Sequence, residues 1–419
     1  MRVAFSALLL AWLLASGATG QEASSLSTQS GPVTRARLLA YPGGPLDGLR
    51  EAGIDLKGSV ALNYQGLTEG SGAKDWRGGG KVDLWITLDG ERLGLWQGFS
   101  IAVHPEINFG SSVNNVGAGI LIPPNTMLAF PTLGGSDTEL SVVLNQTFGD
   151  STNISFGKFN LMDIATRTPI MGGGGLETFM NVAIAAPISG VTPPYLFGII
   201  GTVKTKPAIY TLMIHDPRNA QNDDVISHPF SEGTTVSLSA TLPTKLAGRT
   251  TYIGLRGVYS SATGIDLASL PNLALPNSAV GVLPLQGYRY AGLTFQHFLA
   301  EDPSRPGKGW GIFGDLGLSE GNPNPVGWHA ILGVGGNGTR RDPLDRWGVA
   351  WFKYGLSGDL KDGLSALGID RRDETGIEAY YNAALTPWLR LTADAQWVHP
   401  STVGKDDAVL LGLRLQALF

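Results

Sequence analysis

The sequence predicts an all-β fold, a transmembrane antiparallel β-barrel of about sixteen strands. Three features support this prediction: an export signal at the N-terminus, alternation of apolar and polar side chains along most of the chain, and a final strand that ends on Phe419 without a polar tail. Alternation with a period of two residues is typical of a sheet with one apolar and one polar face. Such a sheet, once closed, crosses a membrane without unpaired backbone groups.

The N-terminus has the parts of a secretory signal peptide. Arg2 supplies a positive charge, Ala4 to Ala15 form an apolar stretch, and Ala18 and Gly20 are small residues before a cleavage site. We therefore expect residues 1–20 to be removed on export. The apolar stretch is too short for a spanning helix, and no other stretch is long enough. The exported protein is thus predicted to be either soluble or a membrane β-barrel.

The composition excludes several classes of function. The chain of 419 residues has 58 glycines, 16 % charged residues and a net charge of −5. This charge offers no broad basic surface for nucleic acid. The absence of cysteine excludes disulfides, thiol nucleophiles and Cys-type zinc sites. Residues 333–338 match a dinucleotide-binding pattern, but no helix follows them, so we expect no cofactor. Asp223–Asp224 and Asp406–Asp407 are not part of a ligand set spaced for a metal, so we expect no metal.

The chain divides into the signal peptide, a polar segment and the barrel. Residues 21–57 are rich in Gly and Pro, and Pro45 and Gly53 suit the two ends of a short helix. Residues 58–419 are predicted to form the barrel. Its strands are expected to begin near Gly58, Gly80, Gly98, Thr138, Thr152, Pro194, Pro207, Gly233, Arg249, Gln286, Gly309, Trp328, Asp345, Asp373, Pro387 and Asp406.

Connections of unequal length also favour an outer-membrane barrel. Residues 110–137, 161–193 and 261–285 are predicted to be long loops, whereas the connection at Thr386–Pro387 is tight. Long loops on one side and short turns on the other are typical of these barrels. The alternative is a soluble secreted β-sandwich, which also alternates.

Charged residues in the middle of the strands indicate which face is the lumen. An Arg or Lys facing lipid at the bilayer midplane costs about 2 to 4 kcal/mol, so these residues are expected to point inward. Lys353 lies on the same face of its strand as neighbours that are predicted to face lipid, so its ammonium group is expected to reach a strand end. The residues predicted to line the pore are Asp83, Trp85, His104, Glu106, Arg256, Phe313, Asp315, Glu378, Arg390, Asp394 and Arg414.

Several segments resemble the OprB family of bacterial carbohydrate-selective porins. They are "LGLWQGFSIAVHPEINFG" (93–110), "FGKFNLMD" (156–163), "FMN" (179–181) and "DRWGVAWFKYGLS" (345–357), and the most specific is the C-terminal run from "GIEAYYNAALTPWL" to Phe419. The resemblance covers most of the mature chain. It implies a barrel of sixteen strands with an N-terminal helical segment, an inward-folded loop, and diffusive uptake of monosaccharides such as glucose.

The resemblance also suggests particular residues. Glu106, in the matching "HPE" segment, is the position that carries over most directly, and His104 lies on the same face. Residues 161–193 are the predicted inward loop, with an exposed external loop as the alternative. Glycines 172–175 in this segment suit either a close backbone approach or flexibility.

A sugar is neutral and rich in hydroxyls, so its passage needs donors, acceptors and aromatic faces that bind it weakly. The predicted function is therefore low-affinity diffusion of small carbohydrates without chemistry. A general or anion-type porin is the first alternative, although the charges on the polar faces are mixed in sign. An outer-membrane enzyme is a weaker alternative, because no catalytic motif accompanies His104.

The final strand predicts how the barrel closes and which partners it meets. Val409, Leu411, Leu413 and Leu415 share one face with Phe419. This strand is expected to pair with the first strand, to face outer-membrane lipid, and to present Phe419 to the barrel-assembly machinery. The sequence leaves open whether the barrel is a monomer or a homotrimer.

Overall fold

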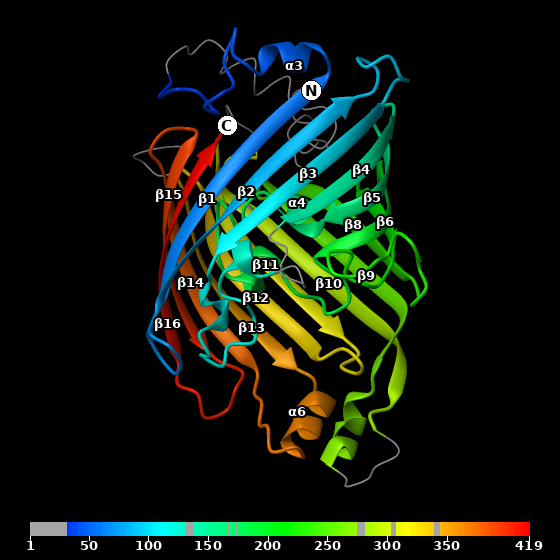
Figure 1. The fold of residues 1–419 in the computed structure, drawn as a ribbon, viewed down its shortest axis with the longest axis vertical. Coiled ribbons are helices and arrows are strands. Elements are labelled where there is room, and N and C mark those ends of the chain that lie inside the picture. The colour runs from blue at the N-terminus through cyan, green and yellow to red at the C-terminus, as the bar shows by residue number, and fades with distance from the viewer. Residues whose placement is uncertain are drawn as a thin grey trace.

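The computed structural model describes residues 32–130, 138–165, 168–172, 175–274, 281–302, 307–338 and 344–419. The predicted signal peptide lies outside the described residues. Within them, sixteen strands form one closed antiparallel barrel in which sequence neighbours pair and β1 pairs with β16 (Figure 1). This closure excludes the β-sandwich and leaves no sheet edge.

The strands are β1 (Ile54–Glu69), β2 (Trp76–Asp89), β3 (Phe99–Gly110), β4 (Thr138–Phe148), β5 (Thr152–Asn160), β6 (Tyr195–Lys204), β7 (Ile209–His215), β8 (Thr235–Leu246), β9 (Arg249–Ile265), β10 (Pro284–Glu301), β11 (Gly309–Ser319), β12 (Val326–Asn337), β13 (Arg346–Leu356), β14 (Glu374–Ala384), β15 (Leu389–His399) and β16 (Ala408–Leu418). The short helices are α3 (Asp47–Glu51), η1 (Val113–Asn115), η2 (Thr126–Leu128), α4 (Leu161–Ala165), α5 (Val182–Ala185), η3 (Leu267–Ala274) and α6 (Gly358–Ser365).

Each of the sixteen strands lies where the alternation predicts it. The largest differences are in β1 and β2, which begin at Ile54 and Trp76 instead of Gly58 and Gly80. Residues 54–57 were expected to belong to the polar segment, but they pair with residues 85–88 of β2. Backbone pairing therefore continues past the end of the clear side-chain alternation. The expected helix is present as α3, and Gly53 follows it with φ 88°.

The two faces of the strands are confirmed. In β15, Leu391 and Trp397 are exposed outward, whereas Thr392 and Gln396 between them are buried inward. Lys353 reaches the end of β13, where its Nζ lies 3.7 Å from Asp373 Oδ2 and 5.5 Å from the ring of Trp328. No helix in the described residues is long and apolar enough to cross a membrane.

The long connections lie at the end of the barrel opposite α3 and the C-terminus. Figure 1 shows α3 and the C-terminus at one end and α6 at the other. The connections 216–234 and 357–373, which were not among the long loops predicted from the sequence, lie at the same end of the barrel, which we call the loop end. Several strands exceed a single bilayer crossing, since β10 has 18 residues and β9 has 17. These strands extend beyond the membrane at their ends.

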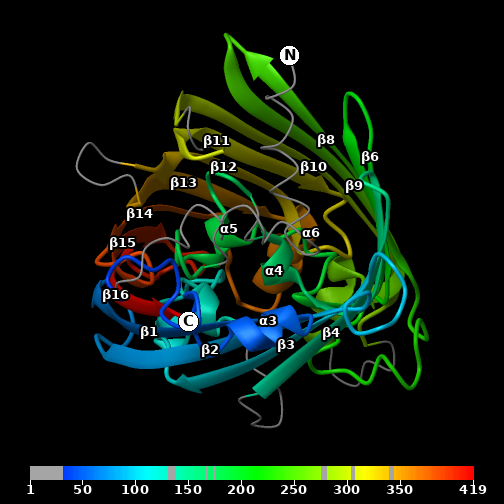
Figure 2. The same ribbon diagram turned by 90° about the horizontal axis from the view of Figure 1, so that it is seen from above.

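Two loops fold into the barrel. The predicted loop carries α4 and α5, which lie inside the ring of strands in Figure 2. Residues 111–130, with η1 and η2, form a second inward loop that the sequence did not predict. The loops contact each other where the N–H and the hydroxyl of Thr126 both donate to Met180 O at 2.7 Å.

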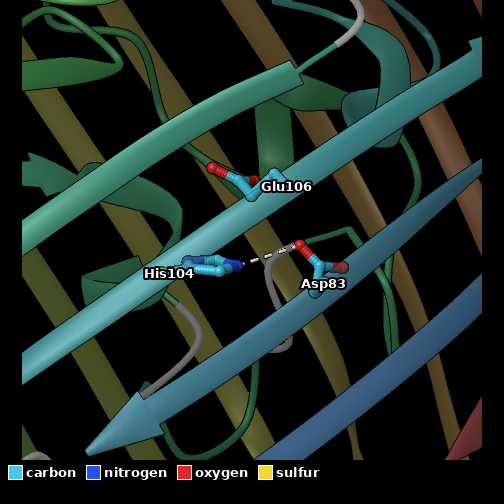
Figure 3. Close-up of side chains that lie close together, drawn as sticks. All are labelled: Asp83, His104 and Glu106. Carbon is cyan, nitrogen blue, oxygen red and sulfur yellow. Dashed lines mark hydrogen bonds and ion pairs between the residues drawn. The ribbon is translucent and has the colours of Figure 1, made fainter.

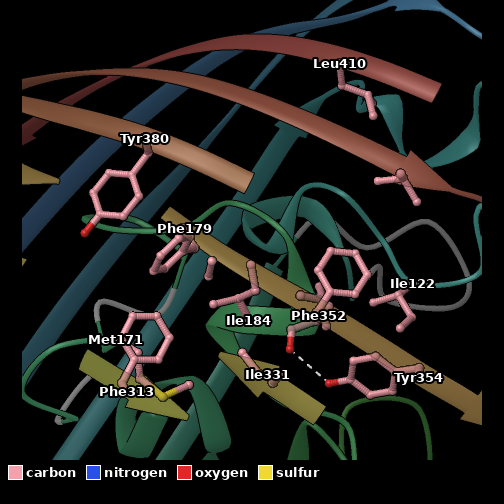
Figure 4. Close-up of a cluster of buried hydrophobic side chains, with 14 of the residues drawn as sticks. Ile122, Met171, Phe179, Ile184, Phe313, Ile331, Phe352, Tyr354, Tyr380 and Leu410 are labelled. Carbon is pink, nitrogen blue, oxygen red and sulfur yellow. Dashed lines mark hydrogen bonds between the residues drawn. The ribbon is translucent and has the colours of Figure 1, made fainter. Parts of the chain in front are cut away.

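An apolar cluster joins the first inward loop to the barrel wall (Figure 4). The ring of Phe179 lies 4.7 Å from that of Tyr380 and 5.7 Å from that of Phe313, both in edge-to-face geometry. Ile184 of α5 is fully buried in the same cluster. Part of the lumen is therefore filled by a packed apolar core. Burial of these side chains stabilises the inward position of the loop.

The closing contact between β1 and the C-terminus generates a test of barrel stability. Gly58 and Phe419 exchange two backbone hydrogen bonds of 2.7 and 2.9 Å. A Cβ on Gly58 would lie 2.1 Å from the Phe419 ring. We expect Gly58→Val to displace this ring and to destabilise the barrel by about 1 to 3 kcal/mol, measured as a lower denaturation midpoint in the heat-dependent gel shift.

Gly257→Val is the matched control, because a Cβ at Gly257 meets nothing within 4 Å. Equal midpoints for the two variants would show that the closing contact contributes no measurable stability.

Candidate functional site

The first inward loop is held by buried charged residues of β14 and β16. The carboxylate of Glu378 accepts hydrogen bonds from the backbone N–H groups of Met180 and Asn181, the latter at 3.0 Å. The guanidinium of Arg414 donates to the carbonyls of Gly175 and Thr178, the latter at 2.8 Å. Glu378 is 0 % exposed and Arg414 is 1 % exposed. These two residues therefore position the loop instead of facing a solute.

Further polar contacts extend this attachment along the loop. Tyr354 donates to Ala183 O at 2.9 Å and accepts from the N–H of Ile188 at 3.1 Å. Gln396 accepts from the side chain of Asn181 at 3.0 Å. The loop backbone thus finds partners on the wall, as buried N–H and C=O groups require.

The second inward loop is held in the same way by another glutamate. Glu374 accepts from the N–H groups of Leu121 and Ile122 at 2.7 and 2.9 Å, and from Ser401 N–H at 3.0 Å. Gln396 donates to Pro124 O at 2.9 Å, so it contacts both loops. Glutamates spaced four residues apart on β14 thereby organise the two inward loops.

A neighbouring part of the wall, β2 and β3, carries a cluster of ionisable and aromatic side chains around Asp163, which lies in α4. Asp163 Oδ2 lies 2.8 Å from His104 Nδ1, and its Oδ1 accepts from the indole N–H of Trp85 at 3.0 Å. The rings of Trp85 and His104 lie 4.7 Å apart. The Asp163 side chain is 28 % exposed. This cluster thus presents a carboxylate beside an aromatic surface.

Asp83, His104 and Glu106 lie together on β2 and β3 (Figure 3). Their ligand atoms lie within 4.8 Å of one another, a spacing that a metal ion would accept. However, the Lys81 ammonium contacts Glu106 and lies 2.9 Å from Asp83 Oδ1. The Lys81 ammonium thus already lies between the two carboxylates and offsets one of their two charges, and the residues form an ion-pair network.

Glu106 also connects this network to the start of the inward loop. Its Oε2 accepts from Asn160 at 2.8 Å and from the hydroxyl of Tyr195 at 3.0 Å. Glu106 is only 1 % exposed. It therefore holds the two ends of the 161–194 connection to the wall, rather than standing free in the lumen.

A third polar group lies on β9 to β12. Arg256 donates to Thr192 Oγ1 at the end of the inward loop and to Ser237 Oγ at 3.2 Å. Asp315 Oδ1 lies 2.7 Å from His329 Nε2, and its Oδ2 accepts from Thr294 at 2.6 Å. These side chains form a third group of polar contacts on the wall, and Arg256 joins this group to the end of the first inward loop.

All the predicted pore residues point inward, but the structure separates them by what they contact. Glu378, Arg414 and Phe313 are covered by the inward loop, so a sugar does not reach them in this arrangement. Asp394 is buried and accepts from Gln396 at 2.9 Å. Arg390 donates to Asn382 at 2.6 Å and to Leu344 O at 2.8 Å, near the end of the barrel that carries the C-terminus.

Sequence reasoning missed three functional candidates. Asp163 and Glu177 lie in the inward loop, and Lys81 lies on β2. The Glu177 side chain is 38 % exposed and lies 3.1 Å from Arg346 Nη1. Lys81 had a signal, since it shares the face of Asp83 two residues away. The loop residues had none, because alternation does not extend into a loop.

Comparison with known proteins identifies the family. The chain matches the model of the carbohydrate-selective porin, OprB family, over residues 73–419. The chain belongs to this family. A search of curated proteins finds no match.

Solved structures agree with the fold of this OprB-family porin. OprB of Pseudomonas putida, in its high-pH structure, is similar with a TM-score of 0.76 and 17 % identity, covering 90 % of this chain and 97 % of that one. The outer membrane channel DcaP of Acinetobacter baumannii has a TM-score of 0.54 and 10 % identity, covering 87 % and 97 %. At these low sequence identities, the structural similarity supports a shared fold only.

Membership in the family confirms several predictions. The protein is a carbohydrate porin of the bacterial outer membrane, and it is a channel rather than an enzyme. The predicted barrel of sixteen strands is also confirmed.

The attachment of the inward loop generates a test on this porin. Glu378→Ala leaves the N–H groups of Met180 and Asn181 without their acceptor. We expect a loss of about 1 to 3 kcal/mol of stability and a larger, noisier open-channel conductance in planar bilayers, because the loop is released into the lumen.

Glu51→Ala, at an exposed position in α3, should change neither quantity. An unchanged conductance in Glu378→Ala would contradict a positioning role for this carboxylate.

Proposed function

We propose that this porin carries monosaccharides such as glucose by facilitated diffusion, without energy coupling. The single observation that carries the proposal is the pair of partly exposed loop carboxylates, Asp163 and Glu177, each held by donors from the wall. The rest of the described loop is largely buried, with contacts to strands from β9 to β16. A solute that crosses the barrel therefore meets these two groups.

The chemistry around the two carboxylates suits a small neutral polyol. Asp163 and Glu177 accept hydrogen bonds from hydroxyls, and Arg346 supplies donors beside Glu177. Trp85 offers an indole face next to Asp163. Such contacts are individually modest, and a passage needs weak binding so that the solute leaves again.

The charges favour a neutral solute over an anion. Among the described interior cations, Lys81 contacts Asp83 and Glu106, and Arg346 pairs with Glu177. The guanidinium groups of Arg256, Arg390 and Arg414 donate to hydroxyl, amide or carbonyl oxygens of the wall and the loops. A continuous path of unpaired basic groups, which an anion channel needs, is therefore not formed by these residues. This argues for the sugar porin over the anion-type alternative.

We also infer the route of assembly. The exposed face of β16, with Leu411, Leu413 and Leu415, leads to Phe419 at the end of the barrel that carries α3. We expect export by residues 1–20, recognition of this strand by the barrel-assembly machinery, and the termini in the periplasm. A homotrimer is tested by the mass of the protein in detergent.

Block of the ion current by glucose tests the proposed passage. We expect Asp163→Asn to weaken the block by roughly fivefold, because losing a charged acceptor costs about 1 kcal/mol at a partly exposed site. Asp150→Asn, at an exposed position in the turn between β4 and β5, is the matched control and should block like the wild type.

Two results count against the proposal. Wild-type porin that shows neither a glucose block nor glucose permeation in liposomes excludes monosaccharide transport. A normal block in Asp163→Asn removes this carboxylate from the passage.

A further inference from the structure

A separate pocket lies at the loop end of the barrel, beside the last residues of the first inward loop. Its volume is about 280 Å³, close to the lower limit of about 300 Å³ for small-molecule pockets. Three segments meet there: the inward loop, the 216–234 connection, and neighbouring parts of β9 and β10. The lining residues are Gly190, Val191, Pro217, Arg218, Glu232, Ser260, Ala262, Thr263 and Tyr288.

Arg218 is fixed in this pocket by a buried carboxylate. Its Nε and Nη2 donate to the two oxygens of Asp216 at 2.9 and 2.7 Å, and Nη2 also donates to His228 O at 2.6 Å. Burial acts to raise the pKa of Asp216, but the hydrogen bonds from Arg218 lower it below its usual value, so the carboxylate stays ionised. Among the described residues, Nη1 of Arg218 has no hydrogen-bond acceptor, so its donors remain available.

Tyr288 supplies an aromatic face held in a defined place. A Cβ on Gly264 of β9 would lie 2.0 Å from the Tyr288 hydroxyl oxygen and 2.8 Å from Pro323 Cβ. The ring therefore occupies space that only glycine leaves open on the neighbouring strand. The Tyr288 hydroxyl has no hydrogen-bond partner among the described residues, so it too is available to a ligand.

The pocket leads toward the interior of the barrel. Tyr288 and Tyr290 pair with Ser260 and Val258, so both tyrosines lie on the same face of β10. The guanidinium of Arg256 lies 5.8 Å from the centre of the Tyr290 ring. Arg256 also contacts Thr192, directly after the pocket residue Val191. Adjacent residues of the first inward loop, Val191 and Thr192, thus contact the pocket and the barrel interior respectively.

We propose that this pocket is a docking site for a hexose before it enters the passage. The ring of Tyr288 stacks on the C–H face of the sugar, Nη1 of Arg218 donates to its hydroxyls, and Glu232 and Thr263 hydrogen-bond at the open side. The inference rests on the proposed function and adds an entry site to it. Weak docking at the mouth raises the rate at which sugar enters from the loop side.

Sided addition of glucose to the whole porin in planar bilayers tests this site. We expect Tyr288→Ala to lower the association rate of block roughly threefold to tenfold for glucose added at the loop side. The rate for glucose added at the opposite side should change much less, since that sugar meets the passage first. Tyr210→Ala, an exposed tyrosine on the outer face, is the matched control.

Gly264→Ala is the second variant, because it keeps every pocket group but displaces the Tyr288 ring. It should reproduce the sided loss and keep the wild-type conductance in salt. Wild-type association rates from both sides in either inserted variant would overturn the docking site. Absence of glucose block in the wild type would instead overturn the proposed function.

A chemical readout is independent of conductance. The chain has no cysteine, so Ala262→Cys places a single thiol in the pocket. Glucose should slow its modification by a thiol reagent, but not that of Val403→Cys, an exposed position elsewhere at the loop end. Equal rates with and without glucose at position 262 would also overturn the site.

Discussion

The shape of the passage depends on the hydrogen bonds between Glu378 and the backbone of the inward loop. A polypeptide inside a barrel must satisfy its N–H and C=O groups away from bulk water. Here the N–H groups of Met180 and Asn181 reach one carboxylate, and the carbonyls of Gly175 and Thr178 reach Arg414. The wall therefore supplies a negative and a positive group to opposite ends of the backbone dipoles, and Phe179 packs between Tyr380 and Phe313.

This attachment divides the interior into parts with different roles. Glu374 and Glu378 on β14 and Arg414 on β16 hold the two inward loops, so these charged groups are lost as sugar contacts. The polar groups that remain partly exposed lie on the first inward loop and on the nearby wall. They are chiefly Asp163 beside Trp85 and Glu177 beside Arg346. Glu374 likewise accepts hydrogen bonds from backbone N–H groups of the second inward loop. Two loops, both hydrogen-bonded to the barrel wall, therefore narrow the channel.

The sequence predicted the barrel well, because alternation reports directly on which face meets lipid. The starts of β4, β5, β9 and β11 are as predicted, and the β16 face was correct residue by residue. It predicted the candidate site less well. Alternation along the strands places the side chains of Arg414 and Arg256 inward. It does not reveal that Arg414 is covered by the first inward loop, whose Thr178 is 236 residues away in the sequence. Asp163 and Glu177 depend on where the loop folds, and that is decided by tertiary contacts with the wall.

Hydrogen exchange of the inward loop tests most directly whether it is a fixed part of the wall. In the intact porin, the amides of Met180 and Asn181 should exchange as slowly as the paired amides of β14, because both are buried and bonded to Glu378. Exchange as fast as that of the exposed residues of the 216–234 connection would contradict the account, since a loop that detaches so often does not define the passage.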